Sequence, residues 1–349
     1  MHPSDGQADQ DRPLWDLYDV ALLDLDGVVY VGDDAVGHAG RALAQARGRG
    51  MRLAFVTNNA SRPPAAVAEH LASLGVPAHA EEVVTSAQAA ARVVAEQVPP
   101  GSAVLVVGGP GLEAALREQG LVPVRSATES PAAVAQGYHP DVGWRDLAEG
   151  AYALAAGVPW VASNTDLTIP TPRGPAPGNG TLVGVLRAAT GREPVVAGKP
   201  EPPMHREAMI RTRSRRPLVV GDRLDTDVEG ATRAGVDSLL VLTGVTTSVD
   251  LVRAPPPRRP TFVSEDLRGL ARAARGLGVA AGADRRGSWT ASVESGRLRL
   301  EQAGDEASGG DEAGRDPLDA LRAACGAMWA EIDPGAVDGV ADALARAGY

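Results

Sequence analysis

Short apolar runs recur along this chain, and each of them ends in polar residues. The first three runs are 20–25, 52–57 and 83–85, and the segments between them carry the spacing of small and apolar residues that is typical of helices. We expect helices at about 39–47 and 63–74. The chain therefore opens with repeated strand–helix units.

The same alternation continues through the middle of the chain. Further strands are expected at 104–107, 218–220 and 239–242, and further helices at 111–120, 203–213 and 226–234. The stretch 164–180 interrupts the pattern, because it is too dense in proline and glycine for regular structure. Alternation of short apolar strands with helices indicates an α/β fold with a doubly wound, mostly parallel sheet.

Both ends of the chain depart from this pattern. Residues 1–13 are polar, and we expect them to be disordered. A linker rich in Gly and Ala occupies 276–283. Beyond it come a hairpin (289–294 and 297–302), low-complexity sequence rich in Gly, Asp and Glu (304–316) and two short helices. We interpret residues 284–349 as a small α+β appendage that is separate from the rest.

The formal charge of −10 is spread unevenly along the chain. Residues 284–349 contain 13 acidic and 7 basic side chains, so this segment carries −6. An acidic chain without a basic stripe binds nucleic acid poorly, and we expect no nucleic-acid partner. The longest apolar stretch, 151–165, is too short and too interrupted to span a bilayer, so we expect no membrane partner either.

The start of the sequence and the cysteine content favour a cytoplasmic location. Asp5, Asp9 and Asp11 lie where a signal peptide would carry basic residues. A single cysteine, Cys325, excludes a disulfide framework within the chain. It lies in an Ala-rich segment, and we expect it to be a small packed residue.

Two aspartates follow the first predicted strand, in the order Leu23-Asp24-Leu25-Asp26-Gly27. A period of two in a strand places Asp24 and Asp26 on the same face, so that two carboxylates lie side by side. Like charges at that distance are unfavourable unless a cation or a shared proton relieves them. Gly27 permits a sharp turn that would expose its N–H to an anion.

Three further polar motifs follow predicted strands. Thr57 and Asn58 supply a hydroxyl and an amide, which are suitable neutral donors for phosphate oxygens. Lys199, the only lysine among 34 basic residues, stands between a strand and a helix start. The strand at 218–220 leads into a carboxylate cluster that includes Asp222 and Asp227, and such oxygen ligands suit Mg²⁺. Open α/β sheets bind their ligands at these strand ends.

The irregular stretch 164–180 carries a fourth group of polar residues, Asn164, Asp166 and Asn179. Proline and glycine restrict or permit unusual backbone angles, so their density here indicates a shaped loop. A loop of this kind either faces a substrate or serves as a structural crossover, and the sequence leaves both interpretations open.

Taken in order, the four strand-end motifs resemble those of the haloacid dehalogenase superfamily of phosphatases, in its IIA group. The resemblance is closest to the actinobacterial glycerol 3-phosphate phosphatase-like members that carry a C-terminal extension, and it covers about 20–270. It implies a Rossmann-like catalytic core formed by 14–85 and 193–275. An α/β cap domain would be inserted between the second and third motifs, at 86–192.

The resemblance also implies a role for each motif residue. Asp24 would attack phosphorus and form an aspartyl-phosphate, and Asp26 would act as the acid and base. Mg²⁺ would be held by Asp24, the backbone carbonyl of Asp26, Asp222 and Asp227. The phosphoryl oxygens would be bound by Thr57, Asn58, Lys199 and the N–H of Gly27. In the family, cap loops contact the leaving group, a role that would fall to Asn164, Asp166 and Asn179.

The sequence thus predicts a Mg²⁺-dependent phosphomonoesterase for a small metabolite, with glycerol 3-phosphate as the leading substrate. Phosphoglycolate, a nucleotide monophosphate or pyridoxal phosphate remain alternatives, and a homodimer is compatible with the sequence. In another class, the chain could be a regulatory or binding protein whose appendage is the recognition module. Asp24, Asp26, Lys199 and Asp222 are all present, which favours an active enzyme.

Overall fold

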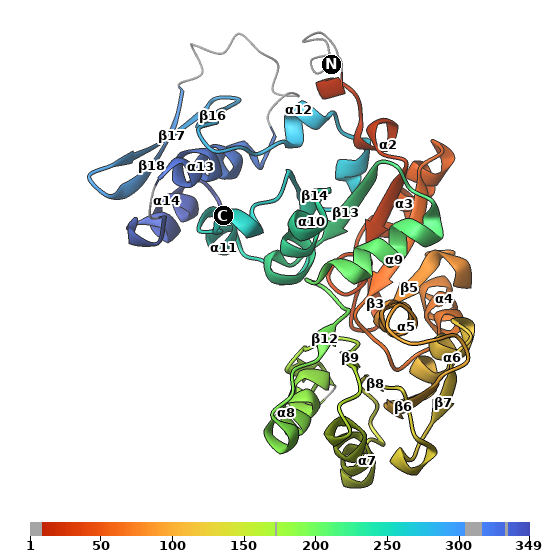
Figure 1. Ribbon diagram of the computed structural model, residues 1–349. Helices are drawn as coiled ribbons and strands as arrows, with labels where there is room; N and C mark the ends of the chain where they lie inside the picture. The colour runs from red at the N-terminus through yellow and green to blue at the C-terminus, as the bar shows by residue number, and fades with distance from the viewer. Residues whose placement is uncertain (1–8, 172, 304–315, 332–333) are drawn as a thin grey trace. The chain divides into compact units, whose positions relative to one another are not determined.

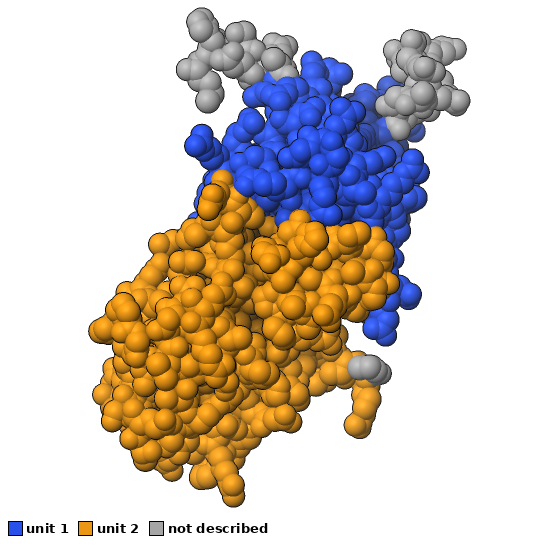
Figure 2. All heavy atoms as spheres, turned by 90° about the vertical axis from the view of Figure 1, so that its right-hand side faces the viewer, with its two compact units in different colours: residues 1–53, 214–349 blue, residues 54–213 orange. Residues whose placement is uncertain are grey.

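The computed structural model describes residues 9–171, 173–303, 316–331 and 334–349. The chain divides into two compact units (Figure 2). Unit 1 consists of residues 1–53 and 214–349, and unit 2 consists of residues 54–213.

Unit 1 is built on parallel strands (Figure 1), in which β15, β14, β13 and β1 are hydrogen-bonded neighbours in that order. The strands of this unit are β1 (Val20–Leu23), β2 (Tyr30–Val31), β3 (Asp34–Ala35), the start of β4 (Arg52–Thr57), β13 (Pro217–Gly221), β14 (Asp237–Val241) and β15 (Phe262–Ser264). β1 is the first strand in the described residues yet pairs with β13, with Val20 opposite Pro217 and Leu23 opposite Val220. All four β1 side chains are buried, as an apolar run inside a parallel sheet requires.

Helices connect and cover these strands. They are α2 (Leu14–Leu17), α3 (Ala39–Gly48), η3 (Leu224–Val228), α10 (Glu229–Ala234), α11 (Ser248–Val252), η4 (Pro256–Arg258), η5 (Leu267–Ala271) and α12 (Ala274–Leu277). The helix expected at 226–234 is divided in two, because η3 is a wider π-type turn that precedes α10. That turn carries Asp225 and Asp227.

Unit 2 contains a second parallel sheet, with the order β12-β9-β8-β6-β7. Its strands are β6 (Ala103–Val107), β7 (Val122–Val124), β8 (Ala133–Gln136), β9 (Trp160–Ala162) and β12 (Val195–Val196), and the unit also holds the parallel pair β4–β5 (Val83–Thr85) and the hairpin β10 (Thr168–Ile169) with β11 (Ala176–Pro177). Its helices are α4 (Pro64–Ser73), η1 (Ala80–Glu82), α5 (Ser86–Ala95), α6 (Pro110–Glu118), η2 (Ala127–Glu129), α7 (Trp144–Ala155), α8 (Asn179–Thr190) and α9 (Pro202–Thr212). The prediction of an α/β fold with parallel sheets is confirmed.

Two expected boundaries differ from the structure. The cap was expected to end at 192, but β12 pairs with β9, so the second sheet extends to Val196. The disordered N-terminus was expected to reach residue 13, whereas Leu14 N–H donates to Arg272 O and Ala274 N–H donates to Arg12 O. These long-range backbone bonds hold residues 12–14 against unit 1, and residues 1–8 lie outside the described part.

The C-terminal segment adds a three-stranded antiparallel sheet and two helices to unit 1. Its elements are β16 (Arg285–Arg286), β17 (Trp289–Glu294), β18 (Arg297–Gln302), α13 (Asp319–Ala330), η7 (Pro334–Ala336) and α14 (Val340–Arg346). The hairpin expected at 289–302 is confirmed. Of the low-complexity sequence expected at 304–316, residues 304–315 lie outside the described part.

The C-terminal segment shares one hydrophobic core with the rest of unit 1. Leu321, Cys325 and Met328 of α13 belong to the same buried cluster as Leu251 and Val263. The segment has its own antiparallel sheet, as expected, but its apolar face is covered by α11 and β15 as well as by its own elements, so its packing is continuous with the rest of unit 1. Cys325 is packed as expected, and burial raises the pKa of its thiol.

Polar contacts reinforce this shared core. Arg322 is fully buried, donates to Val263 O at 2.9 Å and pairs with Asp316 and Asp319. The indole of Trp329 donates to Leu251 O at 3.3 Å, and the Arg259 guanidinium lies 5.3 Å from the Trp329 ring centroid. A buried arginine needs such partners, because an uncompensated charge in the core is costly.

None of the helices in the described ranges is both long and apolar enough to cross a membrane.

We predict that Leu321→Ala destabilises the core of unit 1. Leu321 is fully buried in the shared cluster, and truncation of such a leucine costs about 2–5 kcal/mol. Urea unfolding followed by tryptophan fluorescence should show a lower midpoint, whereas Val245→Ala, at a side chain 69% exposed, should leave the midpoint nearly unchanged. Equal midpoints for the two variants would contradict a shared core.

Candidate functional site

Unit 1 brings three of the predicted carboxylates together. Asp24, Asp222 and Asp227 each offer an oxygen, and these oxygens lie within 4.8 Å of one another. Asp222 and Asp227 are 1% exposed, and Asp24 is half-buried. Three acidic groups in so small and dry a volume repel strongly, and a divalent cation would relieve that repulsion. All the donors are hard oxygens, so the set fits Mg²⁺.

Backbone ends of neighbouring strands position this cluster. Asp24 directly follows β1, and its N–H continues the ladder by donating to Val220 O at 2.8 Å. Asp222 directly follows β13. Asp227 lies in the η3 turn, where its Oδ2 accepts from Arg223 N–H at 3.2 Å. Parallel strands place all their carboxyl ends at one edge, which explains why residues far apart in the sequence meet there.

Asp225 is the carboxylate of this motif that is outside the cluster. It receives two hydrogen bonds from the Arg223 guanidinium, at 3.0 and 2.9 Å. These bonds hold the pKa of Asp225 below its usual range despite partial burial. The negative charge of Asp225 is therefore neutralised by Arg223, and this ion pair lies at the η3 turn.

Glycine allows the backbone to approach the carboxylates closely. Gly27 has φ +83°, and a Cβ built there would lie 2.5 Å from Asp222 Oδ2. The expected role of the Gly27 N–H in phosphate binding does not fit the structure, because this N–H donates to Tyr30 O at 2.8 Å. Gly27 instead makes room for the Asp222 carboxylate.

The segment Thr243–Thr246 supports the cluster and was missed by sequence reasoning. Asp222 Oδ2 accepts from Val245 N–H at 2.7 Å, and Thr246 N–H donates to Asp222 O at 3.2 Å. Thr243 donates its hydroxyl hydrogen to Gly27 O, and Gly244 lies so close that a Cβ would be 2.0 Å from Asp222 Oδ2. Thr-Gly one residue after the strand β14 was the signal that could have revealed it.

The predicted carboxylate Asp26 lies outside the three-carboxylate cluster. Its side chain is exposed, and its backbone bridges to Tyr30. An exposed carboxylate exchanges protons with water readily, which is compatible with the expected acid and base role.

Unit 2 brings together the predicted neutral donors and the lysine. Lys199 is 5% exposed, and its Nζ lies 3.4 Å from Val56 O. The Asn58 side chain contacts the Lys199 main chain twice, because Oδ1 accepts from Lys199 N–H at 2.9 Å and Nδ2 donates to Lys199 O at 3.1 Å. Thr57 Oγ1 accepts from Asn59 N–H at 3.1 Å, and a hydroxyl that accepts can still donate its own hydrogen.

The loop residues Asn164, Asp166 and Asn179 also lie in this second cluster. Asn58 Nδ2 donates to Asp166 Oδ2 at 3.2 Å, and Asn164 Nδ2 donates to Asn58 O at 2.8 Å. Asn179, the first residue of α8, donates its Nδ2 to Asn164 O at 2.7 Å. The loop is therefore tied to the motif that contains Asn58.

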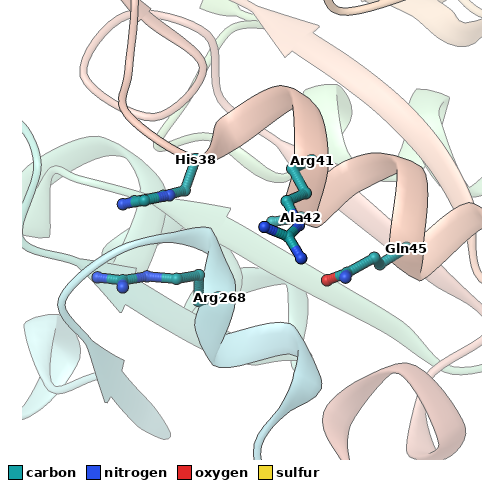
Figure 3. Close-up of a pocket in the computed structure, with 5 residues that line it drawn as sticks. All are labelled: His38, Arg41, Ala42, Gln45 and Arg268. Atoms are coloured by element: carbon teal, nitrogen blue, oxygen red, sulfur yellow. The ribbon is translucent and has the colours of Figure 1, made fainter.

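A pocket of about 310 Å³ lies elsewhere in unit 1 (Figure 3), between α3 and η5. It is lined by His38, Arg41, Ala42, Gln45 and Arg268. The Arg268 guanidinium is already paired with Asp266, with Nε at 2.9 Å from both carboxylate oxygens. This pocket contains none of the expected site residues, so the carboxylate cluster remains the candidate site.

Comparisons with known proteins agree with this geometry. Residues 21–122 match the family model of haloacid dehalogenase-like hydrolases, and residues 196–270 match a model described as HAD-hydrolase-like. Residues 286–349 match a model described as a GCN5-related N-acetyltransferase like domain. The two hydrolase matches contain all three clustered carboxylates.

Similar proteins include several phosphatases. The D-glycerol 3-phosphate phosphatase of Mycobacterium tuberculosis is 47% identical over 312 residues, which are 89% of this chain and 86% of that protein. A crystal structure of a glycerol phosphate phosphatase from the same organism, in complex with magnesium, superposes with a TM-score of 0.86 at 43% identity, covering 97% of this chain and 99% of that one. A 5'-nucleotidase of Bacillus subtilis is 39% identical over 227 residues, 64% of this chain and 87% of that protein.

We predict that Mg²⁺ raises the melting temperature of the protein through the carboxylate cluster. A cation that binds the folded state and neutralises three clustered carboxylates, two of them buried, stabilises that state by mass action. Thermal unfolding with EDTA and with a series of Mg²⁺ concentrations should show the rise in wild type.

Asp222→Asn should lose most of this rise, and Asp225→Asn provides a matched control. Asp225 belongs to the same motif but is bound by Arg223, so its variant should keep the full response to Mg²⁺. An unchanged response in Asp222→Asn would remove Asp222 from the metal site.

Proposed function

We propose that this chain, which belongs to the haloacid dehalogenase-like phosphatases, hydrolyses glycerol 3-phosphate through an aspartyl-phosphate intermediate. The chain is a Mg²⁺-dependent phosphomonoester hydrolase. What we propose is that its substrate is glycerol 3-phosphate and that its intermediate is an aspartyl-phosphate. The observation that carries it is the buried cluster of Asp24, Asp222 and Asp227 in a chain 47% identical to a D-glycerol 3-phosphate phosphatase.

In the proposed first step, a carboxylate oxygen of Asp24 attacks phosphorus. The bond from Asp24 to phosphorus forms as the ester P–O bond breaks, and Asp26 donates its proton to the departing alkoxide. In the second step, Asp26 removes a proton from water, which attacks phosphorus and releases phosphate from Asp24. The leaving alkoxide is a poor leaving group, so a proton donor such as Asp26 is required for phosphate esters.

Charge neutralisation accounts for most of the proposed catalysis. Asp24, Asp222, Asp227 and the backbone carbonyl of Asp26 would hold Mg²⁺, which would neutralise negative charge on the phosphoryl group when bound. Lys199 and the Thr57 hydroxyl would bind phosphoryl oxygens. Phosphoryl transfer depends mainly on positioning and on such electrostatic stabilisation, so this set of groups suffices for the reaction.

Charge and cysteine content bear on the enzyme's location and on its binding partners. We infer a cytoplasmic location, a small-molecule substrate and neither nucleic acid nor membrane as a partner, supported by the charge of −10 and the single cysteine. A homodimer remains compatible with the sequence. The 5'-nucleotidase among the relatives supports nucleotide monophosphates as the second candidate substrate class.

We predict that Asp24→Asn lowers kcat by more than about 100-fold, because hydrolysis of phosphate monoesters without catalysis is among the slowest reactions known and an amide cannot act as the nucleophile. Phosphate release from glycerol 3-phosphate should be measured beside Asp33→Asn, which makes the same chemical change at an exposed residue. Asp33→Asn should keep wild-type activity. Substantial turnover by Asp24→Asn would refute attack by Asp24.

We further predict that glycerol 3-phosphate gives the highest kcat/KM in a panel that includes phosphoglycolate, pyridoxal phosphate and a nucleoside 5'-monophosphate. The panel measures phosphate release at equal concentrations of enzyme and Mg²⁺. A higher kcat/KM for the nucleotide would replace our substrate assignment by the second candidate, and the phosphatase chemistry would stand.

A further inference from the structure

The Asn58 amide in unit 2 has no N–H left for a phosphoryl oxygen. An asparagine amide carries two N–H donors. One of them goes to Lys199 O at 3.1 Å and the other to Asp166 Oδ2 at 3.2 Å. The Asn58 side chain, which was expected to bind phosphate, instead holds the main chain of Lys199.

Asp166 helps to determine which way the Asn58 amide points. In the observed orientation, Oδ1 faces Lys199 N–H and Nδ2 faces the Asp166 carboxylate. If the amide were rotated by 180°, its oxygen would face the carboxylate and its NH₂ would face another N–H donor. Both contacts would be repulsive, and the Lys199 carbonyl would also face an oxygen, so the acceptor oxygen of Asp166 and the Lys199 main chain together favour the observed orientation.

The loop that carries Asp166 is itself held in place. Asp166 N–H donates to Asn164 Oδ1 at 3.1 Å, and Asn164 Nδ2 donates to Asn58 O at 2.8 Å. Asn164 and Asn179 are 5% and 1% exposed, and Asn179 donates to Asn164 O. The hydrogen bonds therefore close a partly buried ring through Asn58, Asp166 and Asn164, and such a ring restricts the motion of its members.

Lys199 depends on this ring for its position. Its ammonium is carried by four flexible methylene groups, so the main chain must be fixed before Nζ can be placed reproducibly. Asn58 binds both the N–H and the carbonyl of Lys199, while Nζ lies 3.4 Å from Val56 O. Gly198 permits the close approach, because a Cβ there would lie 2.7 Å from Asn58 Oδ1.

We propose that Asp166 is a positioning residue for phosphoryl transfer: it orients the Asn58 amide, which fixes the main chain of Lys199. This inference rests on the proposed function, in which Lys199 binds the phosphoryl group. It also gives the loop at 164–180 a different role from the one that we expected. Asn164, Asp166 and Asn179 brace the lysine motif, instead of contacting the leaving group as the family resemblance implied.

Two substrates distinguish a brace from a leaving-group contact. Glycerol 3-phosphate and p-nitrophenyl phosphate share the phosphoryl group but differ completely in the leaving group. We expect Asp166→Ala to lower kcat for both substrates by a similar factor of about 10–100, because a small misplacement of a catalytic group is costly. Asp166→Asn keeps an acceptor oxygen at the same place. Its kcat for both substrates should therefore stay within about threefold of the wild-type value.

Two further variants control for folding and for local effects. Asp141→Ala removes an exposed aspartate from the same unit and should match wild type. Gly198→Ala should reproduce the Asp166→Ala phenotype, because its Cβ would lie 2.7 Å from Asn58 Oδ1 and 2.5 Å from the backbone oxygen of Ser163. All variants should be compared at temperatures below their measured melting temperatures.

Labelling of Lys199 gives a readout that does not depend on activity. An amine-directed reagent at mildly alkaline pH can modify only Lys199 and the N-terminal amine, since the chain has one lysine. Peptide mapping should show slow modification of Lys199 in wild type and Asp166→Asn, and several-fold faster modification in Asp166→Ala and Gly198→Ala.

The outcomes separate this inference from the proposed function. A loss confined to glycerol 3-phosphate would make Asp166 a leaving-group contact and overturn the brace. Unchanged labelling together with unchanged kcat in Asp166→Ala would also overturn it. Failure of wild type to hydrolyse either substrate would refute the proposed function instead, and the labelling rates would still decide whether Asp166 holds Lys199.

Discussion

Electrostatic repulsion among three carboxylates is the constraint on which the rest of unit 1 depends. Asp24, Asp222 and Asp227 present oxygens within 4.8 Å of one another, two of them almost without exposure to water. In a medium of low dielectric constant that repulsion is severe, so the backbone must hold the groups together against it. Strand ends supply the rigidity, and N–H donors from Arg223 and Val245 supply favourable dipoles. The same repulsion creates the affinity for a divalent cation.

Unit 2 holds a single positively charged side chain, that of Lys199, in a nearly buried position. It does so with neutral amides and one carboxylate, and each amide hydrogen of Asn58 has a defined acceptor. Hydrogen bonds link Asn58, Asp166 and Asn164 in a closed ring, and this ring couples the loop at Asp166 to the lysine motif. The carboxylate cluster therefore lies in one unit and the nearly buried lysine in the other.

The C-terminal segment contributes through packing, since the catalytic motifs all precede it. Its helix α13 contributes a face of small and apolar side chains to the cluster that also contains Leu251 and Val263. The match to an N-acetyltransferase-like model describes this segment alone. The shared core includes Val228, which directly follows Asp227 in η3, so the packing of this segment stabilises the turn that carries one of the three carboxylates.

The sequence by itself determined the elements and the residue types of the site, because these depend on local patterns. Apolar runs at β1, β4 and β13, which lead to Asp, Thr and Asp, were sufficient to predict three of the strand-end motifs and a parallel α/β fold. Only the tertiary structure decided the partner of each polar group. The Gly27 N–H binds Tyr30, Asn58 reaches Asp166 across 108 positions, and α13 shares the core of unit 1. Such contacts arise from chain segments that meet only after folding, and no local pattern encodes which of several available donors and acceptors will face each other.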